Sequence, residues 1–179
     1  MNDTLNRPPV PDDIITISNR LAGALRARGW GCATAESCTG GGIALGITSV
    51  AGSSDYMHGG IVAYSNPIKQ TLLNVRRSTL DSVGAVSEEC AIEMARGVRQ
   101  VLGTEVGISS TGIAGPGGAT NRKPVGLVYI AVSTPETDEV RELRLSGDRQ
   151  HVMRESARLA LELANSTIGD GAPAPETEQ

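Results

Sequence analysis

Short apolar segments alternate with helical segments along most of this chain, and this alternation limits the folds available to it. Strands are predicted at residues 32–37, 60–65 and 105–111, and helices at 12–28, 42–50, 66–75 and 88–102. Two more strands, at 125–134 and 139–146, follow one another directly, before a last helix that ends near residue 168. Alternating strands and helices favour a parallel sheet covered by helices, and the adjacent pair adds antiparallel strands. We therefore predict an α/β fold with a mixed sheet.

No internal repeat or linker interrupts this pattern, and 179 residues are enough for one domain with its own core. Residues 12–168 are predicted to form that domain. The Pro-rich residues 1–11 are expected to be a flexible lead-in, and the acidic, Pro-rich residues 169–179 a disordered tail.

Composition argues against several classes of protein. The net charge is −4, and there are three Tyr, one Trp and no Phe, so neither a basic surface nor stacking platforms for nucleic acid are expected. The N-terminal residues resemble no signal peptide, and no apolar segment is long enough to span a membrane. The three cysteines form no CxxC pair and no metal-ligand spacing. A cytoplasmic protein without metal or cofactor, bound to neither nucleic acid nor membrane, is expected.

Three glycine-rich turns follow predicted strands, at residues 37–42, 111–118 and 146–149. Ligands of α/β proteins bind at the carboxyl ends of strands, and such turns offer backbone N–H groups to anions. Glycines that merely form the turns are the alternative. Three turns with hydroxyl and guanidinium side chains favour a small ligand that carries a phosphate. The chain has neither GxxxxGK[ST] nor GxGxxG, which argues against ATP hydrolysis and Rossmann redox chemistry.

Histidine is scarce, whereas one lysine stands in an unusual position. His58 is expected in a turn and His151 at an exposed helix start, so a Ser-His-Asp triad is not favoured. Lys69 falls in the first turn of a helix predicted to begin with Asn66 as N-cap and Pro67. The helix dipole and any burial would lower its pKa and make it a base, although an exposed lysine is the alternative.

Several side chains near these turns are candidates for chemistry or binding. Ser54 and Tyr64 are expected to converge with Lys69, while Ser37 and Cys38 are rival nucleophiles. Cys38 is equally compatible with a small buried residue. Glu36 either orients a ligand hydroxyl or a backbone amide, or is a structural carboxylate. Lys123 either reaches a phosphate or is solvated.

Six segments together resemble the CinA C-terminal domain family. They are TAESCTGG (34–41), AGSSDYMHGGIVAYSNPIK (51–69), GAVSEE (84–89), STGIAGPGG (110–118), KPVG (123–126) and SGDR (146–149). The resemblance covers roughly residues 12–168 and implies a single three-layer α/β/α domain with a mixed sheet. The family often carries this domain behind a larger N-terminal one, so a stand-alone member is expected here.

The resemblance implies an amidohydrolase that converts nicotinamide mononucleotide to nicotinic acid mononucleotide and ammonia, in pyridine nucleotide (NAD) recycling. The family is described as using a Ser/Lys pair. Carried over by position, Ser54 is the nucleophile, Lys69 the general base and Tyr64 an assisting residue. The residues expected to bind substrate or line the pocket are Ser37, Thr39, Gly40, Gly41, Thr111, Gly112, Gly115 and Arg149.

Three alternatives remain open from the sequence. One is an amidase for another small carboxamide, one is a nucleotide-binding regulatory module without catalysis, and one is a cysteine hydrolase that uses Cys38. The resemblance also makes a homo-oligomer the expected state, with a dimer among the options. The family label "competence- or damage-inducible" finds no support in the residues themselves.

Overall fold

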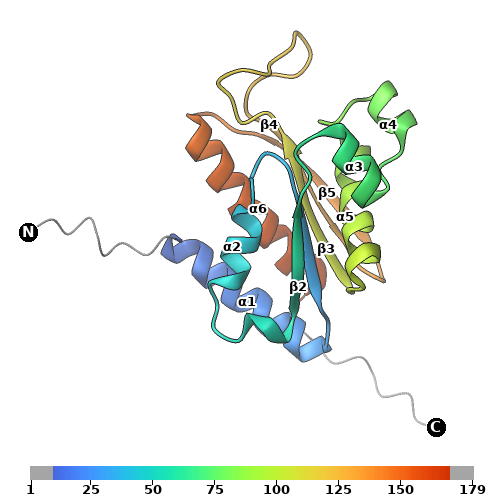
Figure 1. Cartoon of the computed structure of the whole chain (residues 1–179). Coiled ribbons are helices and arrows are strands. Elements are labelled where there is room, and N and C mark those ends of the chain that lie inside the picture. Colours follow the sequence, from blue (N-terminus) through green and yellow to red (C-terminus); the bar gives the residue numbers. More distant parts are fainter. Residues whose placement is uncertain (1–9, 170–179) are drawn as a thin grey trace, which may run out of the picture.

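A five-stranded mixed sheet in the order β2-β1-β3-β4-β5 lies at the centre of the computed structural model, which describes residues 10–169 (Figure 1). The strands are β1 Cys32–Glu36, β2 Met57–Val62, β3 Val106–Gly112, β4 Leu127–Ser133 and β5 Asp138–Arg144. This confirms the predicted α/β fold with a mixed sheet. Most of the predicted lead-in and tail, residues 1–9 and 170–179, lies outside the described residues.

The direction of the strands decides where the functional turns lie. β1 pairs in parallel with both β2 and β3, whereas β4 is antiparallel to its neighbours β3 and β5. The carboxyl ends of β1, β2, β3 and β5 therefore lie at one edge of the sheet, which we call the C-edge. All three glycine-rich turns follow strands that end there.

Helices cover both faces of the sheet and give the three predicted layers (Figure 1). One face carries α1 (Asp12–Arg28), α2 (Gly42–Thr48) and α6 (Arg149–Ile168), which pack against one another. The other face carries α5 (Glu88–Leu102), with α3 (Asn66–Leu73) and α4 (Arg77–Ser82) packed against it. With no phenylalanine, the buried apolar side chains are mostly Ala, Val, Ile and Leu.

Two glycines let α5 approach its neighbours more closely than any side chain would permit. A Cβ at Gly97 would lie 2.0 Å from the carbonyl oxygen of Leu73, at the end of α3, and one at Gly107 would lie 2.0 Å from that of Ala95. Both distances are far inside van der Waals contact. The close packing fixes α3, the helix that carries Lys69, on α5.

The predicted boundaries differ from the observed ones mainly around β2 and at two helix starts. β2 begins at Met57, three residues before the predicted strand, because backbone pairing with β1 includes residues that we predicted to form a turn. The short helix α4 was not predicted. The N-cap of α3 is Ser65, not the predicted Asn66, and the N-cap of α1 is Pro11. At α5, which begins at the predicted residue 88, the Ser87 side chain caps the helix by accepting the N–H of Cys90.

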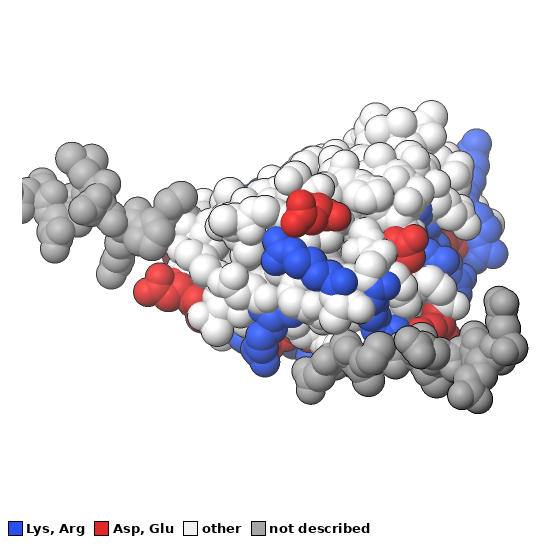
Figure 2. Space-filling model, turned by 90° about the horizontal axis from the view of Figure 1, so that it is seen from below, with Lys and Arg blue, Asp and Glu red and all other residues white. Residues whose placement is uncertain are grey.

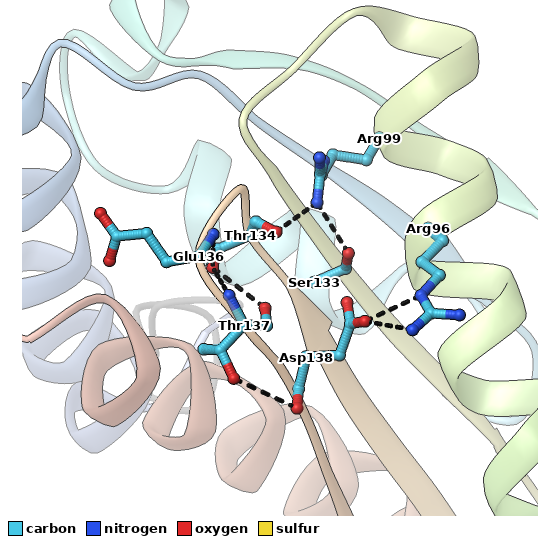
Figure 3. A network of polar contacts seen from close by, with 7 residues as sticks. All are labelled: Arg96, Arg99, Ser133, Thr134, Glu136, Thr137 and Asp138. Atoms are coloured by element: carbon cyan, nitrogen blue, oxygen red, sulfur yellow. Dashed lines mark hydrogen bonds and ion pairs between the residues drawn. The ribbon is translucent and has the colours of Figure 1, made fainter.

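At the opposite edge of the sheet, the β4–β5 hairpin is tied to α5 by a polar network (Figure 3). Arg96 Nε donates to Asp138 Oδ2 over 2.8 Å, and Arg99 Nη1 donates to Ser133 Oγ over 2.9 Å and to the carbonyl of Thr134. Figure 2 views the molecule from this end, where acidic and basic side chains are interspersed. The two arginines of α5 thus anchor the hairpin, since each donates hydrogen bonds to residues of the hairpin.

Candidate active site

The segments at the C-edge enclose a cavity of about 220 Å³. The turn after β1, the segment between β2 and α3, the end of β3 and the start of α6 all contribute to its wall. The lining residues are Ser37, Cys38, Tyr64, Asn66, Lys69, Ala85, Val86, Thr111, Gly112, Ala114 and Arg149. Seven of the candidates named from the sequence are therefore brought together, namely Ser37, Cys38, Tyr64, Lys69, Thr111, Gly112 and Arg149.

Lys69 is buried in the wall of this cavity, with a side chain that is 1% exposed. Its Nζ donates to Ser37 Oγ over 3.1 Å and to the carbonyl oxygen of Ala63 over 2.6 Å. Burial lowers the pKa of Lys69 below its ordinary value, against a smaller opposing effect of the nearby Cys90 and Cys38. In its neutral form the amine has a lone pair to accept the Ser37 proton.

The structure does not bring Ser54 to Lys69, which contradicts the predicted Ser54–Lys69 pair. Ser54 is exposed in the short 3-10 helix Ser53–Asp55, before β2, whereas Tyr64 and Lys69 follow β2. The six residues of β2 separate the two edges of the sheet by about 20 Å at ~3.3 Å per residue. The serine that Lys69 contacts is Ser37, the rival candidate.

Cys38, the other rival nucleophile, is held as a thiol. It is 5% exposed, and burial raises its pKa to about 12, with the hydroxyl of Ser110 and the amine of Lys69 acting in the opposite direction. Because the thiolate is the reactive form of cysteine, this environment disfavours a cysteine nucleophile. Cys38 behaves as the small buried residue of the alternative interpretation.

Tyr64 and Arg149 form the outer rim of the cavity. Arg149 Nη1 donates to the carbonyl oxygen of Gly115 over 2.8 Å, and its Nη2 donates to the Tyr64 hydroxyl over 3.3 Å. Tyr64 is 63% exposed. The guanidinium therefore connects α6 with the loop after β3 and with the β2–α3 segment, and it places a positive charge at the mouth.

The remaining predicted binding residues differ in whether their hydroxyl and N–H groups already bind other parts of the protein. Thr111 lines the cavity, and its hydroxyl donates to the carbonyl of Ala85 over 2.7 Å. The Thr39 hydroxyl is buried and donates to Glu36, and the Gly41 N–H does the same. Gly40 is exposed, and its N–H donates to the carbonyl of Ser37. Thr39 and Gly41 are thus occupied by the protein itself.

Two further side chains have places that the sequence left open or did not indicate. Lys123 Nζ donates to the carbonyls of Val83 and Val86, so it ties the loop after β3 to the segment between α4 and α5, and it does not line the cavity. Asn66 lines the cavity, although its pattern predicted only a helix cap. An Asn-Pro pair predicts a helix start whether or not the asparagine also lines a cavity, so the sequence pattern alone could not place Asn66 in the cavity wall.

Neither histidine lines the cavity. His58 lies within β2, not in the predicted turn, and His151 lies in the first turn of α6. Among residues 10–169, no group of three His, Cys, Asp or Glu is arranged to hold a metal ion. None of the helices in this part of the chain is long and apolar enough to cross a membrane.

The family model of the CinA C-terminal domain matches residues 14–168, and the chain belongs to that family. The chain is 49% identical over 139 residues to a putative competence-damage inducible protein of Caldanaerobacter subterraneus subsp. tengcongensis. The matched region covers 78% of this chain and 34% of the relative. The chain is also 42% identical over 171 residues to a CinA-like protein of Syntrophomonas wolfei, covering 96% and 41%. The chain thus spans about a third to two fifths of these relatives.

Solved structures of the same superfamily share the whole fold. The competence/damage inducible protein CihA of Agrobacterium tumefaciens is 37% identical, with a TM-score of 0.85 over 88% of this chain and 96% of that one. A CinA superfamily protein of Klebsiella pneumoniae is 34% identical, with a TM-score of 0.83 over 87% and 97%. The agreement confirms the predicted fold and family.

Proposed function

We propose that this protein is a cytoplasmic amidohydrolase that releases ammonia from the carboxamide of nicotinamide mononucleotide, as a step in pyridine nucleotide recycling. The observation that carries the proposal is the buried contact between Lys69 Nζ and Ser37 Oγ inside a cavity with a cationic rim. A buried lysine beside a serine is a known way to activate a hydroxyl nucleophile without histidine. The choice of substrate rests on the resemblance to the CinA C-terminal domain family.

The first step follows from the positions of Ser37 and Lys69. Neutral Lys69 accepts the Ser37 proton while Ser37 Oγ attacks the carboxamide carbon. The carbonyl oxygen becomes an oxyanion, which needs N–H donors. Within residues 10–169, the N–H groups of Cys38 and Thr39 donate to no backbone or side-chain oxygen, whereas those of Ser37, Gly40, Gly41 and Gly42 do. The two free amides directly after the nucleophile are the proposed donors.

Collapse of this intermediate breaks the carbon–nitrogen bond. The departing nitrogen takes the proton from Lys69 and leaves as ammonia, and an ester to Ser37 remains. Lys69, neutral again, removes a proton from water, which attacks the ester carbon. The proton then returns to Ser37 as nicotinic acid mononucleotide forms. Tyr64 lies at the rim with Arg149 and assists by orienting the substrate.

The phosphate of the substrate is proposed to bind at Arg149. Replacing Arg149 with methionine is expected to raise KM for nicotinamide mononucleotide by about ten- to a hundredfold, because a hydrogen bond to a charged group is lost. KM for nicotinamide riboside, which has no phosphate, should change much less. Arg154→Met, an exposed position on the same helix outside this cavity, is the matched control. Equal effects on both substrates would place the phosphate elsewhere.

The proposed activity is tested by incubating purified protein with nicotinamide mononucleotide. We expect ammonia and nicotinic acid mononucleotide in equal amounts, and the reaction should persist in the presence of a chelator. A panel of small carboxamides separates this substrate from other amides. Turnover of another carboxamide alone would assign a different amidase, and binding of the nucleotide without any ammonia would favour a regulatory module.

A further inference from the structure

Glu36, the last residue of β1, is a buried carboxylate that the proposed reaction does not use. Its side chain is 1% exposed, and it directly precedes Ser37. Oε2 accepts hydrogen bonds from Thr39 Oγ1 (2.6 Å) and from the N–H groups of Gly41 (3.0 Å) and Ile43 (3.0 Å). Oε1 accepts one from the N–H of Ala44 (2.8 Å). All four partners are donors, as an ionised carboxylate requires.

These four donors belong to the turn after Ser37 and to the first residues of α2. The carboxylate therefore links the end of β1 to the start of α2 across the turn that carries Ser37. A negative charge is favourable at this end of a helix, and here the protein supplies it. An external phosphate at the α2 N-terminus would have to displace Glu36.

The same carboxylate orients the Thr39 hydroxyl in the turn and, through it, the Ser110 hydroxyl on the neighbouring strand β3. Thr39 Oγ1 has one proton, which it donates to Glu36, so Ser110 Oγ must be the donor in its 2.6 Å contact with Thr39 Oγ1. Ser110 lies on β3, and its carbonyl oxygen accepts the N–H of Ser37 over 3.0 Å. The nucleophile turn is thus held by the Glu36 carboxylate on one side and by the Ser110 carbonyl of β3 on the other.

We propose that Glu36 is a positioning residue for Ser37. By accepting four donors of residues 39–44, it fixes the turn in the form that places Ser37 Oγ against Lys69 and leaves the N–H groups of Cys38 and Thr39 free for the oxyanion. This inference rests on the proposed role of Ser37. A carboxylate that only stabilises the fold is the competing explanation, and the chain contains one for comparison.

That comparison is Glu93 on α5, which also binds a backbone N–H and a threonine hydroxyl. Its carboxylate accepts from the Arg76 N–H (2.9 Å) and from Thr79 Oγ1 (2.8 Å), and it pairs with the Arg76 guanidinium. Glu93 does not line the cavity. Removing either carboxylate destabilises local structure, but only the loss of Glu36 should alter the chemistry.

The test compares Glu36→Gln, Glu36→Asp and Glu93→Gln in the whole protein. Glutamine keeps the shape of Glu36 but turns an amide donor toward N–H donors. We expect kcat for nicotinamide mononucleotide to fall about ten- to a hundredfold in Glu36→Gln, because a displaced Ser37 turn misaligns the reacting groups. KM should stay within about twofold. Glu36→Asp should recover part of kcat. Glu93→Gln should lower the melting temperature and leave kcat of the folded protein unchanged.

A second readout makes the test independent of the substrate. The rate at which a fluorophosphonate probe labels Ser37, measured by intact mass, should fall in Glu36→Gln and not in Glu93→Gln. Unchanged kcat and labelling in folded Glu36→Gln would overturn the role of Glu36 alone. A wild-type protein that is labelled but does not turn over the nucleotide would refute only the substrate. If neither reaction occurs, the role of Ser37 and that of Glu36 both fail.

Discussion

The variant Ser37→Ala should lose ammonia release from nicotinamide mononucleotide by about a thousandfold or more, the scale seen when a serine nucleophile is removed. The loss is expected because Ser37 Oγ is the hydroxyl within 3.1 Å of the buried Lys69 amine. Initial rates of ammonia release, with substrate binding followed by calorimetry, measure the effect. Binding should persist, since alanine removes only the attacking oxygen.

Ser54→Ala is the matched control for this prediction. Ser54 follows Gly52 in a short 3-10 helix, where it is exposed, and it lies at the other edge of the sheet. Its replacement should leave kcat and KM unchanged. The opposite pattern, an inactive Ser54→Ala and an active Ser37→Ala, would refute the cavity as the active site and restore the pairing that we carried over from the family motif.

Replacement of Lys69 has the second largest expected effect. Both Lys69→Met and Lys69→Arg should lower kcat about a hundredfold to ten-thousandfold, the range of general base catalysis, because neither side chain accepts a proton at neutral pH. In the wild type, kcat/KM should rise with pH as Lys69 loses its proton. Since burial lowers its pKa, the midpoint should lie below the ordinary lysine value of 10.5.

The same pKa shift has a consequence for stability with a definite sign. Between the lowered pKa in the folded protein and 10.5, the unfolded chain binds more protons at Lys69 than the folded one does. The stability of the wild type relative to Lys69→Met should therefore rise with pH through this window and be flat below it. Urea unfolding of both proteins across the alkaline range measures the difference. A relative stability that falls with pH would show that the Lys69 ammonium is favoured in the folded state.

The fold was largely predictable because periodicity and turn residues act locally. Alternating apolar segments, glycine at the ends of strands and the Ser87 cap each define an element without knowledge of the rest of the chain. The exceptions are short. The first residues of β2 and the helix α4 depend on tertiary contacts, which override weak local preferences.

Which side chains meet at the site was harder to predict from the sequence, because this depends on the end of a strand at which each residue lies. Ser54, Tyr64 and Lys69 are close in sequence, and we expected them to converge. A strand between the first residue and the other two carries them to opposite edges of the sheet. Ser37 and Lys69, 32 residues apart, meet because β1 and β2 are parallel neighbours.

Some roles lie beyond any sequence pattern. Burial of Lys69 and Cys38, which lowers the pKa of the amine and raises the pKa of the thiol, follows only from what packs around them. The same holds for Glu36, where the sequence allowed a ligand contact, an amide contact or a structural role with equal ease. The hydrogen-bond partners decide between them.

The cavity is assembled from two separate stretches of the chain. Ser37 and Lys69 both come from the first half, on the β1–β2 side, whereas Thr111 and Arg149 come from the end of β3 and the start of α6. In the proposed reaction, the first stretch supplies the serine and its base, and the second supplies the arginine that is proposed to bind the phosphate. Under that proposal, substitutions or insertions between residues 111 and 149 are expected to change which carboxamide is accepted without disturbing Ser37 and Lys69, so relatives that share the reaction are expected to differ in substrate.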